Sequence, residues 1–482
     1  MQFLSKHVGR SGWRVHALGW IGGAALACCT ASQAETISFA QARMAMQSQS
    51  AQLAASRKAV ESAQLRREGM ERLGGPSVAV TGMAYRYSAN VDVSLDPARN
   101  ALSNALGALP PALGGQVGQL PQLTQLPSSY ELQRQNNAAS ASVSALWPVY
   151  MGGLSDAVRE GLDGKSLEAQ ADAATAQDQL YSQLVQRYFT AQLAQRAAVL
   201  RHRALEGVRA HDAAAQRMLQ AGVIAQVERL QASAALADAQ QQSHKADGDA
   251  QLARSALART VHHAQGVLPS TPLFVAQQAL PALEDFQASA MAHHPGLRKV
   301  AAKRTQAQAL HGASEALRKP QVLAFGVREV NTQGKPNWVA GMAVRWTLWD
   351  SIDRDKLAAA GQRSIEQAEL TDAQVRSDIA LLVEKNWLAV EQARQHYQAG
   401  QAQEDLARAL LRLRRAGFQA GTSTSLEVMD AELNLAKVQT ERASVANDYV
   451  QALAALLESS GQTDEFEQYM ARADIVITPD AP

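Results

Sequence analysis

The sequence predicts a mostly helical protein with a small β part, in which one unit is built twice. Three observations predict it. The stretches LQAGVIAQVERLQASAALAD (219–238) and FQAGTSTSLEVMDAELNLAK (418–437) share a glycine, an acid six residues later and alanines in register. Four other segments alternate apolar with small or polar residues, which is typical of strands. Alanine-rich stretches with helical spacing, far longer than an ordinary globular helix, separate them.

The N-terminus predicts export. Basic residues precede an apolar run (17–29), and small residues at the usual cleavage positions suit a cut before Glu35, which assigns residues 1–34 to a signal peptide. Cleavage there would remove Cys28 and Cys29, the two cysteines of the sequence. Acylation of Cys28 or Cys29 is the alternative for this segment. No later segment approaches the ~18 apolar residues of a membrane-spanning helix, so we expect any membrane insertion to use strands.

Two constant offsets define the repeat and locate an insertion. An offset of 244 residues (297 − 53) pairs Leu53 with Leu297, and an offset of 199 residues (421 − 222) pairs Gly222 with Gly421. The first copy is therefore longer by 45 residues (244 − 199). The stretch between its two strands is rich in Pro, Gly, Leu and Gln, and it predicts a long loop over 89–136.

The domain boundaries follow from this repeat. They are a signal peptide (1–34), a first repeat (35–262) with strands at 77–88 and 137–147 and a hairpin tip near 222, a linker (263–280), a second repeat (281–461) with strands at 321–330 and 337–349 and a tip near 421, and a C-terminal tail (462–482). Each repeat has the order helix, strand, strand, very long helix, glycine break, helix. We expect each glycine to take the left-handed conformation that ends a helix, so that each copy forms a helical hairpin.

The strand at 337–349 carries the membrane prediction. Trp338, Met342, Val344 and Trp346 fall on one face, where aromatics bracket an apolar row. Such alternation over about ten residues suits an outer-membrane strand, although a strand of a soluble sandwich alternates in the same way. Export and the very long helices favour the membrane interpretation. Because the smallest barrels have about eight strands, four strands cannot close one, and the chain must oligomerise: two copies would give eight strands and three would give twelve.

These features resemble the TolC family of outer-membrane efflux channels. The similarity lies in the export signal, the repeated strand pair and hairpin, WPVYMGG at 147–153, His294-Pro295 at the start of the second repeat, and the two glycine tips. It implies a homotrimer with a 12-stranded β-barrel in outer-membrane lipid and an α-barrel tunnel through the periplasm. It further implies a periplasmic adaptor (membrane fusion) protein and an inner-membrane transporter of RND or ABC type as partners. Drug or toxic-compound efflux and type I protein secretion both stay open.

The resemblance also suggests residues of a periplasmic constriction. Family sequences carry two aspartates after the second tip, and Glu427 and Asp430 occupy those places. Three copies would turn each acid into a ring of carboxylates that attracts cations. Glu427 also fits the third position of a capping box begun by Thr424, and both roles can hold. In the first copy Ala225 has no capping hydroxyl, so capping does not explain Glu228, which is a further candidate for the constriction.

Phe418 and Ser423 depart from the family pattern. Phe418 stands where related channels use a tyrosine hydroxyl to help close the tip, and Ser423 replaces an arginine. We therefore expect closure to depend on other contacts, such as Arg229, Arg414 or Arg415 with the acids. The tip residues expected to face an adaptor are Ala221, Gly222, Val223, Ala420, Gly421 and Thr422.

No enzyme, metal or cofactor site is expected. His262-His263 and His293-His294 are adjacent pairs whose side chains point different ways on a helix, and no spacing completes a metal site. No phosphate-binding loop, dinucleotide glycine pattern or nucleophile elbow occurs. With 46 basic against 45 acidic side chains, the chain gives no sign of a nucleic-acid partner. We predict a passive conduit in the outer membrane of a Gram-negative bacterium. The alternative is a periplasmic coiled-coil scaffold or adhesin whose strands form a soluble cap.

Overall fold

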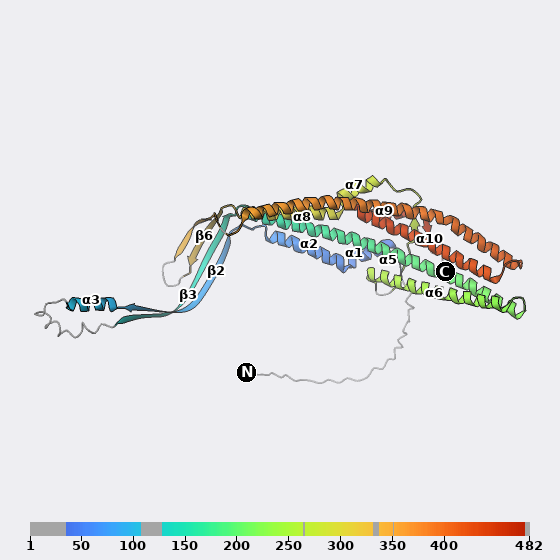
Figure 1. The fold of residues 1–482 in the computed structure, drawn as a ribbon, viewed down its shortest axis with the longest axis horizontal. Coiled ribbons are helices and arrows are strands. Elements are labelled where there is room, and N and C mark those ends of the chain that lie inside the picture. Colours follow the sequence, from blue (N-terminus) through green and yellow to red (C-terminus); the bar gives the residue numbers. More distant parts are fainter. Residues whose placement is uncertain (1–34, 108–127, 264–265, 331–336, 350, 478–482) are drawn as a thin grey trace, which may run out of the picture.

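The molecule is elongated, with two helical hairpins at one end and a β-sheet at the other (Figure 1). A computed structural model describes residues 35–107, 128–263, 266–330, 337–349 and 351–477. The predicted signal peptide, both cysteines and the middle of the predicted loop lie outside these ranges. None of the described helices carries a stretch that is long and apolar enough to cross a bilayer.

The order of elements repeats within the chain. The described helices are α1 (Phe39–Gln49), α2 (Ala51–Gly69), α3 (Asp96–Gly107), α5 (Leu154–Gln220), α6 (Gln226–Thr260), α7 (Leu283–His293), α8 (Pro295–Ala316), α9 (Arg354–Gln419), α10 (Ser425–Ser460) and α11 (Phe466–Ala471), with a 3-10 turn at Thr463–Glu465. The described strands are β1 (Glu35–Ile37), β2 (Ser77–Ser94), β3 (Ser129–Tyr150), β4 (Val267–Pro269), β5 (Leu273–Val275), β6 (Gln321–Glu329), β7 (Trp338–Arg345) and β8 (Ile475–Ile477). Helices α5 and α6, of 67 and 35 residues, correspond to α9 and α10, of 66 and 36. The predicted order of helix, strand pair and helical hairpin is confirmed in both halves.

Both hairpins turn at a left-handed glycine, as predicted. Gly222 has a φ of 73° and Gly421 has a φ of 77°. The N–H groups of Val223 and Thr422 each donate to the carbonyl five residues earlier, at 2.9 and 2.8 Å. This Schellman arrangement satisfies carbonyls that the end of a helix leaves unpaired, and it needs a residue without a Cβ at the turn. The glycines therefore fix where the chain reverses.

The long helices pack side by side through small residues. Helix α5 contacts α6, α8 and α10, and α9 contacts α10 and α8. Alanines such as Ala232 and Ala239 of α6 and Ala443 and Ala446 of α10 are buried along these seams. Their small side chains let the helix backbones approach closely, which favours coiled-coil packing over long distances. At the tips the helices follow the order α6, α5, α10, α9.

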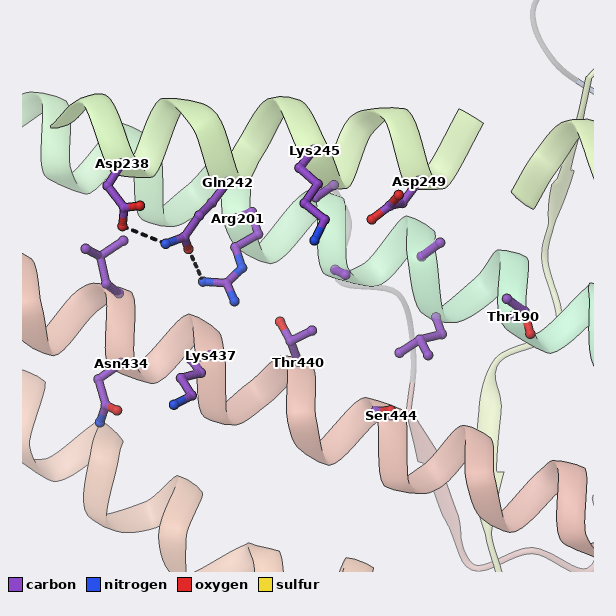
Figure 2. A pocket seen from close by; sticks show the side chains of 15 residues that line it. Thr190, Arg201, Asp238, Gln242, Lys245, Asp249, Asn434, Lys437, Thr440 and Ser444 are labelled. Atoms are coloured by element: carbon purple, nitrogen blue, oxygen red, sulfur yellow. Dashed lines mark hydrogen bonds between the residues drawn. The ribbon is translucent and has the colours of Figure 1, made fainter. Parts of the chain in front are cut away.

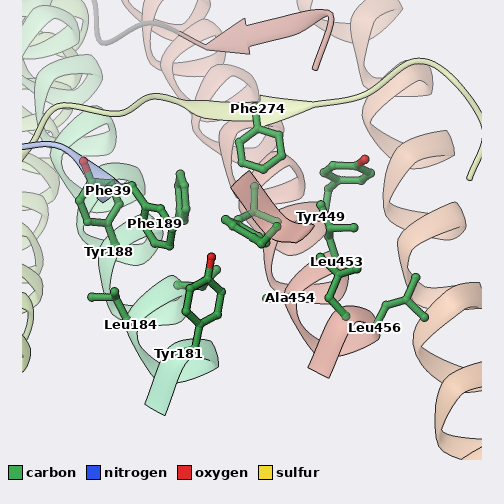
Figure 3. Packing of buried hydrophobic residues seen from close by; sticks show 14 of the residues in the cluster. Phe39, Tyr181, Leu184, Tyr188, Phe189, Phe274, Tyr449, Leu453, Ala454 and Leu456 are labelled. Carbon is green, nitrogen blue, oxygen red and sulfur yellow. The ribbon is translucent and has the colours of Figure 1, made fainter. Parts of the chain in front are cut away.

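The largest core lies midway along the helices (Figure 3). Phe39, Tyr188, Phe189, Phe274 and Phe466 are buried there, with neighbouring ring centroids 5.2–6.1 Å apart. Two small sheets close over it, because β1 pairs with β4 and β5 pairs with β8. The predicted linker and tail thus contribute strands to this core, which joins the N-terminal segment to both hairpins.

The four remaining strands form one antiparallel sheet in the order β2-β3-β6-β7. The two strand pairs of the repeat lie next to each other through β3 and β6. Within a single chain, β2 and β7 are edge strands, each with one row of backbone groups that the described sheet leaves unpaired.

Three of the four predicted strands, those of β2, β3 and β7, have wrong ends. β2 continues to Ser94 and β3 begins at Ser129, so both ends of the predicted 89–136 loop are strand. Polar residues such as Asn90 are uncommon in strands, so the sequence alone does not predict this extension. Whether such a residue forms strand depends on its neighbours in the sheet as much as on its own propensity. β7 ends at Arg345 rather than at residue 349, since the chain there leaves the sheet and the Trp346 indole N–H donates to the Arg318 carbonyl at 3.2 Å.

Candidate functional site at the hairpin tips

Glu427 is held by local contacts at the second tip. The Thr424 hydroxyl accepts the Glu427 N–H at 3.2 Å, and the Thr424 N–H donates to Glu427 Oε2 at 3.0 Å, so the predicted capping box is formed. Glu427 Oε1 also lies 3.1 Å from the Arg414 guanidinium. The predicted pair of Arg414 with an acid is therefore present within one chain.

Glu228 at the first tip also caps its helix. The Ala225 N–H donates to Glu228 Oε2 at 3.1 Å. The prediction that capping does not explain Glu228 is therefore wrong, because the half of the capping box made by the acid needs only a backbone N–H. Arg229 does not meet the acids of the second tip in this chain; it pairs with Asp212 of its own hairpin at 2.7 Å.

Asp430 differs from both glutamates. It lies on α10 beyond the first turn, its side chain is exposed, and none of the described residues forms an ion pair with it. The six tip residues predicted to face an adaptor are exposed as well: Ala221, Gly222, Val223, Ala420, Gly421 and Thr422. The free carboxylate and the bare turns leave this end of the molecule available for contacts outside the chain.

Phe418 makes a contact between the hairpins. Its ring packs edge-on against the His211 ring of α5, with centroids 5.4 Å apart and an interplanar angle of 82°. It also packs against Leu411, Val428 and Ala431 within its own hairpin. Phe418 thus joins α9 to α5 through its ring alone, without the hydroxyl that a tyrosine would carry.

The strongest link between the hairpins is a buried carboxylate that sequence reasoning missed. The side chain of Glu432 of α10 is 5% exposed, and its Oε1 lies 2.8 Å from Arg415 of α9 and 3.6 Å from His211 of α5. Oε2 faces Gly207 of α5 and has no hydrogen-bond partner. The predicted pairing of Arg415 with an acid is found, but the acid is Glu432 rather than a tip residue.

The charge of Glu432 is kept despite its burial. Burial alone raises the pKa of a carboxyl, whereas the contacts with His211 and Arg415 favour the ionised form and lower the Glu432 pKa below its ordinary value. The Ser425 hydroxyl, in the first turn of α10, adds a hydrogen bond to the His211 carbonyl at 3.2 Å. One residue of α5, His211, is therefore held by three residues of the second hairpin: its ring contacts Phe418 and Glu432, and its carbonyl accepts from Ser425.

Further from the tips, the two hairpins separate and leave a groove of about 640 Å³ between α6 and α10, floored by α5. Figure 2 shows a hydrogen-bonded chain on one wall, in which Gln242 donates to Asp238 at 2.6 Å and accepts from Arg201 at 2.7 Å. Lys437 and Thr440 of α10 line the opposite wall. Polar and charged side chains line both walls of the groove, and apolar side chains such as Leu193 and Leu433 lie between them.

At the other end, the sheet presents the predicted apolar face. Trp338, Met342 and Val344 are exposed on one face of β7. Residues paired directly across an antiparallel sheet share a face, and the register from Trp338 through Arg328 reaches Val143 of β3 and Val80 of β2. Trp346 lies just past the strand and is exposed as well. Among the described residues, no group of His, Cys, Asp and Glu is placed to hold a metal ion.

The comparisons with known proteins agree with this architecture. Residues 288–462 match the sequence model of the outer membrane efflux protein family. A comparison with curated protein sequences gives no match.

Solved structures share the fold over most of the chain. They include CusC, described for its transmembrane channel formation (TM-score 0.70, 14% identity, 88% of this chain and 92% of that chain). VceC from Vibrio cholerae has a TM-score of 0.69 at 12% identity, and the match covers 88% of this chain and 96% of VceC. The open state of the MtrE outer membrane channel from Neisseria gonorrhoeae has a TM-score of 0.70 at 16% identity, and the match covers 88% of this chain and 89% of MtrE. The second repeat thus matches the outer membrane efflux protein family in sequence, and nearly the whole chain shares the fold of the TolC-like channels.

Proposed function

We propose that three copies of this chain form a passive export channel, with a 12-stranded barrel in the outer membrane and a helical tunnel in the periplasm. The observation that carries the proposal is the sheet with two unpaired edges, β2 and β7. Unpaired backbone groups are costly in hydrocarbon, so each edge requires a strand from another copy. Three copies supply twelve strands, which leave a wider lumen than eight.

The helical end offers a second surface for neighbouring copies. A leucine stripe on α9 is exposed in the single chain: Leu370 (74%), Leu381 (66%), Leu406 (70%) and Leu413 (70%). Their spacing keeps them on one side of the helix. Since α9 lies at the edge of the order α6, α5, α10, α9, another copy placed beside it would cover this stripe. The edges of the sheet and of the helical layer thus both favour side-by-side assembly.

Threefold assembly gives the tip its proposed gating role. Asp430, Glu427 and Glu228 would each form a ring of three carboxylates around a periplasmic constriction. Within each copy, the contacts of His211 with Phe418 and Glu432 would resist separation of the two hairpins. A periplasmic adaptor would engage the exposed turns at Gly222 and Gly421, and an inner-membrane transporter of RND or ABC type would supply the energy.

Planar-bilayer recording of the purified protein tests this function. A trimeric channel gives discrete single-channel steps and migrates as a heat-modifiable oligomer on gels. Recovery of a monomer from the periplasm without detergent would instead support the scaffold alternative.

A tip variant tests the adaptor contact separately. Gly421→Leu is expected to weaken adaptor binding at least tenfold while leaving the oligomer intact, because a side chain at a left-handed turn disrupts the tip. Gly248→Leu is the control, since that helical glycine has open space around it. Equal adaptor binding by both variants would contradict the tip assignment.

A further inference from the structure

The β2–β3 ribbon runs far beyond the rest of the sheet. β6 has 9 residues and β7 has 8, whereas β2 has 18 and β3 has 22. The ladder of β6 ends where Glu329 pairs with Ser142, and the strands β2 and β3 continue alone from Met83 paired with Ser140 to Ser94 paired with Ser129. Figure 1 shows this extension projecting away from the helices, with α3 at its far end.

The thickness of a membrane accounts for the short strands but not for the extension. A transmembrane strand needs ~9–11 residues, and β6 and β7 are close to that length. Residues 83–94 of β2 add about 40 Å of contour at roughly 3.3 Å per residue. The extension therefore lies outside the hydrocarbon, where lipid chains cannot cover its side chains.

The two faces of the extension differ in polarity. One face is polar on both strands, with Arg86, Ser88, Asn90 and Asp92 on β2 and Gln135, Gln133 and Glu131 opposite them on β3. The other face is mainly apolar, with Tyr85, Tyr87, Val91 and Val93 on β2 and Leu132 and Tyr130 opposite the two valines, and Arg134 among them. Val91, Val93, Tyr130 and Leu132 are all exposed in the single chain.

Helix α3 carries a second unpartnered apolar stripe. Ala98, Ala101, Leu102 and Ala105 recur at the spacing of one helix face, and Arg99, Asn100, Ser103 and Asn104 occupy the other. An apolar face of this kind is normally covered in water-soluble structure. The extension thus presents an apolar ribbon face and an apolar helix face that the described part of one chain leaves mostly exposed, with Tyr87 and Leu102 partly covered.

We propose that the extensions of three copies pack against one another beyond the barrel and form a cap over its outer mouth. This inference rests on the proposed trimer. The partner is another copy of this chain, because three ribbons would rise from the rim of one barrel and each would meet its own copies first. Burial of Val91, Val93, Tyr130 and Leu132 between copies stabilises the cap at ~25 cal/mol per Å² of apolar surface, while the polar faces stay in water.

Single cysteines on the two faces test this packing. The sequence has cysteines only at 28 and 29, within the predicted signal peptide, so Val91→Cys, Leu132→Cys and the control Asn90→Cys introduce isolated thiols. A short bismaleimide applied to the outer-membrane protein is expected to join copies through Val91→Cys or Leu132→Cys at least fivefold more than through Asn90→Cys. Equal crosslinking of the two faces, or none on the apolar face, would overturn the cap.

Crosslinking at the tunnel separates failure of the cap from failure of the trimer. A separate variant, Leu406→Cys on α9, is treated with the same bismaleimide. Crosslinking of this variant reports that the helical layers of neighbouring copies have assembled. Assembly without apolar-face crosslinks overturns the cap alone, and a monomer at both places overturns the cap together with the proposed function.

Conductance gives an independent readout. The pair Val91→Asp with Leu132→Asp is expected to raise single-channel conductance at least twofold, because charges between the copies open the cap. The control, Asn90→Asp with Gln133→Glu, adds two acids to the polar face and is expected to leave conductance unchanged. Equal conductance of both doubles and the parent would contradict an outer mouth narrowed by the cap.

Discussion

Glu432 on α10 faces the backbone of Gly207 on α5 so closely that a Cβ on Gly207 would lie 1.7 Å from Glu432 Oε2. A glycine inside a 67-residue helix costs stability, since alanine is better by about 1 kcal/mol in a helix. The close approach of Glu432 explains why a glycine occupies this helical position. It lets a charged side chain of the second hairpin settle against the first, where Arg415 and His211 reach the other oxygen.

Gly207→Ala should therefore loosen the two hairpins. The added methyl displaces the Glu432 carboxylate from its contacts, and we expect a net weakening of about 1–2 kcal/mol after the gain in helix propensity is subtracted. Hydrogen exchange of the α5 amides around residues 204–215 should rise, and the channel should spend more time open. Gly248→Ala is the matched control, because a methyl there meets no neighbour. Slower exchange in both variants would show that helix propensity dominates and that the contact has little weight.

The contact between the hairpins should depend on pH in the acidic range. The Glu432 pKa is lowered in the folded chain, so its stabilising contribution is present above the ordinary carboxyl pKa of about 4.3 and is lost as pH falls through the folded value. The groups facing this carboxylate are His211 from α5 and Arg415 from α9.

Channel recordings between pH 6 and pH 3.5 test this dependence. They should show opening that increases below about pH 4.3. Glu432→Gln should be more open at pH 6 and lose the change. Glu404→Gln removes another carboxylate with a lowered pKa that joins α9 to Arg442 of the same hairpin, and it should keep the change. Identical profiles for the two variants would count against the assignment to Glu432.

The carboxylates near the tips should set ion preference. Asp430→Asn with Glu427→Gln should lower the cation-to-anion permeability ratio severalfold, as measured from reversal potentials in a salt gradient. Asp430→Asn alone should carry most of the effect, since Glu427 is engaged by Thr424 and Arg414 while Asp430 is exposed. An unchanged permeability ratio in the double variant would show that neither acid sets ion preference and that both have local structural roles only.

The exposed face of β7 should be intolerant of charge. Met342→Arg places a cation on the proposed lipid face and should destabilise the assembled barrel by about 2–4 kcal/mol. Ala343→Arg places the same cation on the opposite face, where it should cost much less. Urea unfolding of the two variants in lipid vesicles compares them, and equal losses would argue that neither face meets lipid.

The repeat, the strand pairs and the turns could be predicted because each depends on a local pattern. A left-handed glycine ends a helix for reasons confined to a few residues, and Gly222 and Gly421 behave as the sequence indicates. Alternation placed β6 and β7 nearly correctly for the same reason. The extension of β2 and β3 was missed because residues such as Asn90 and Asp92 are poor strand formers alone and become strand through the backbone ladder that β2 forms with β3.

The site at the tips was only half predictable. Capping by Glu427 follows from Thr424 three residues earlier, and the structure forms that box. The link through His211, Glu432 and Gly207 joins residues more than 200 positions apart, so no spacing within either hairpin reveals it. The offset between the two copies gives the only clue, because the first copy has Ser233 at the position equivalent to Glu432 and the second copy alone carries the acid.

The number of copies in the membrane-embedded particle distinguishes a shared barrel from a single independent chain. Native mass spectrometry of the full chain, released from lipid nanodiscs, should give the mass of three protomers, because the free edges of β2 and β7 have to be paired by neighbouring copies. A stable particle of one chain that needs neither lipid nor detergent would contradict the channel.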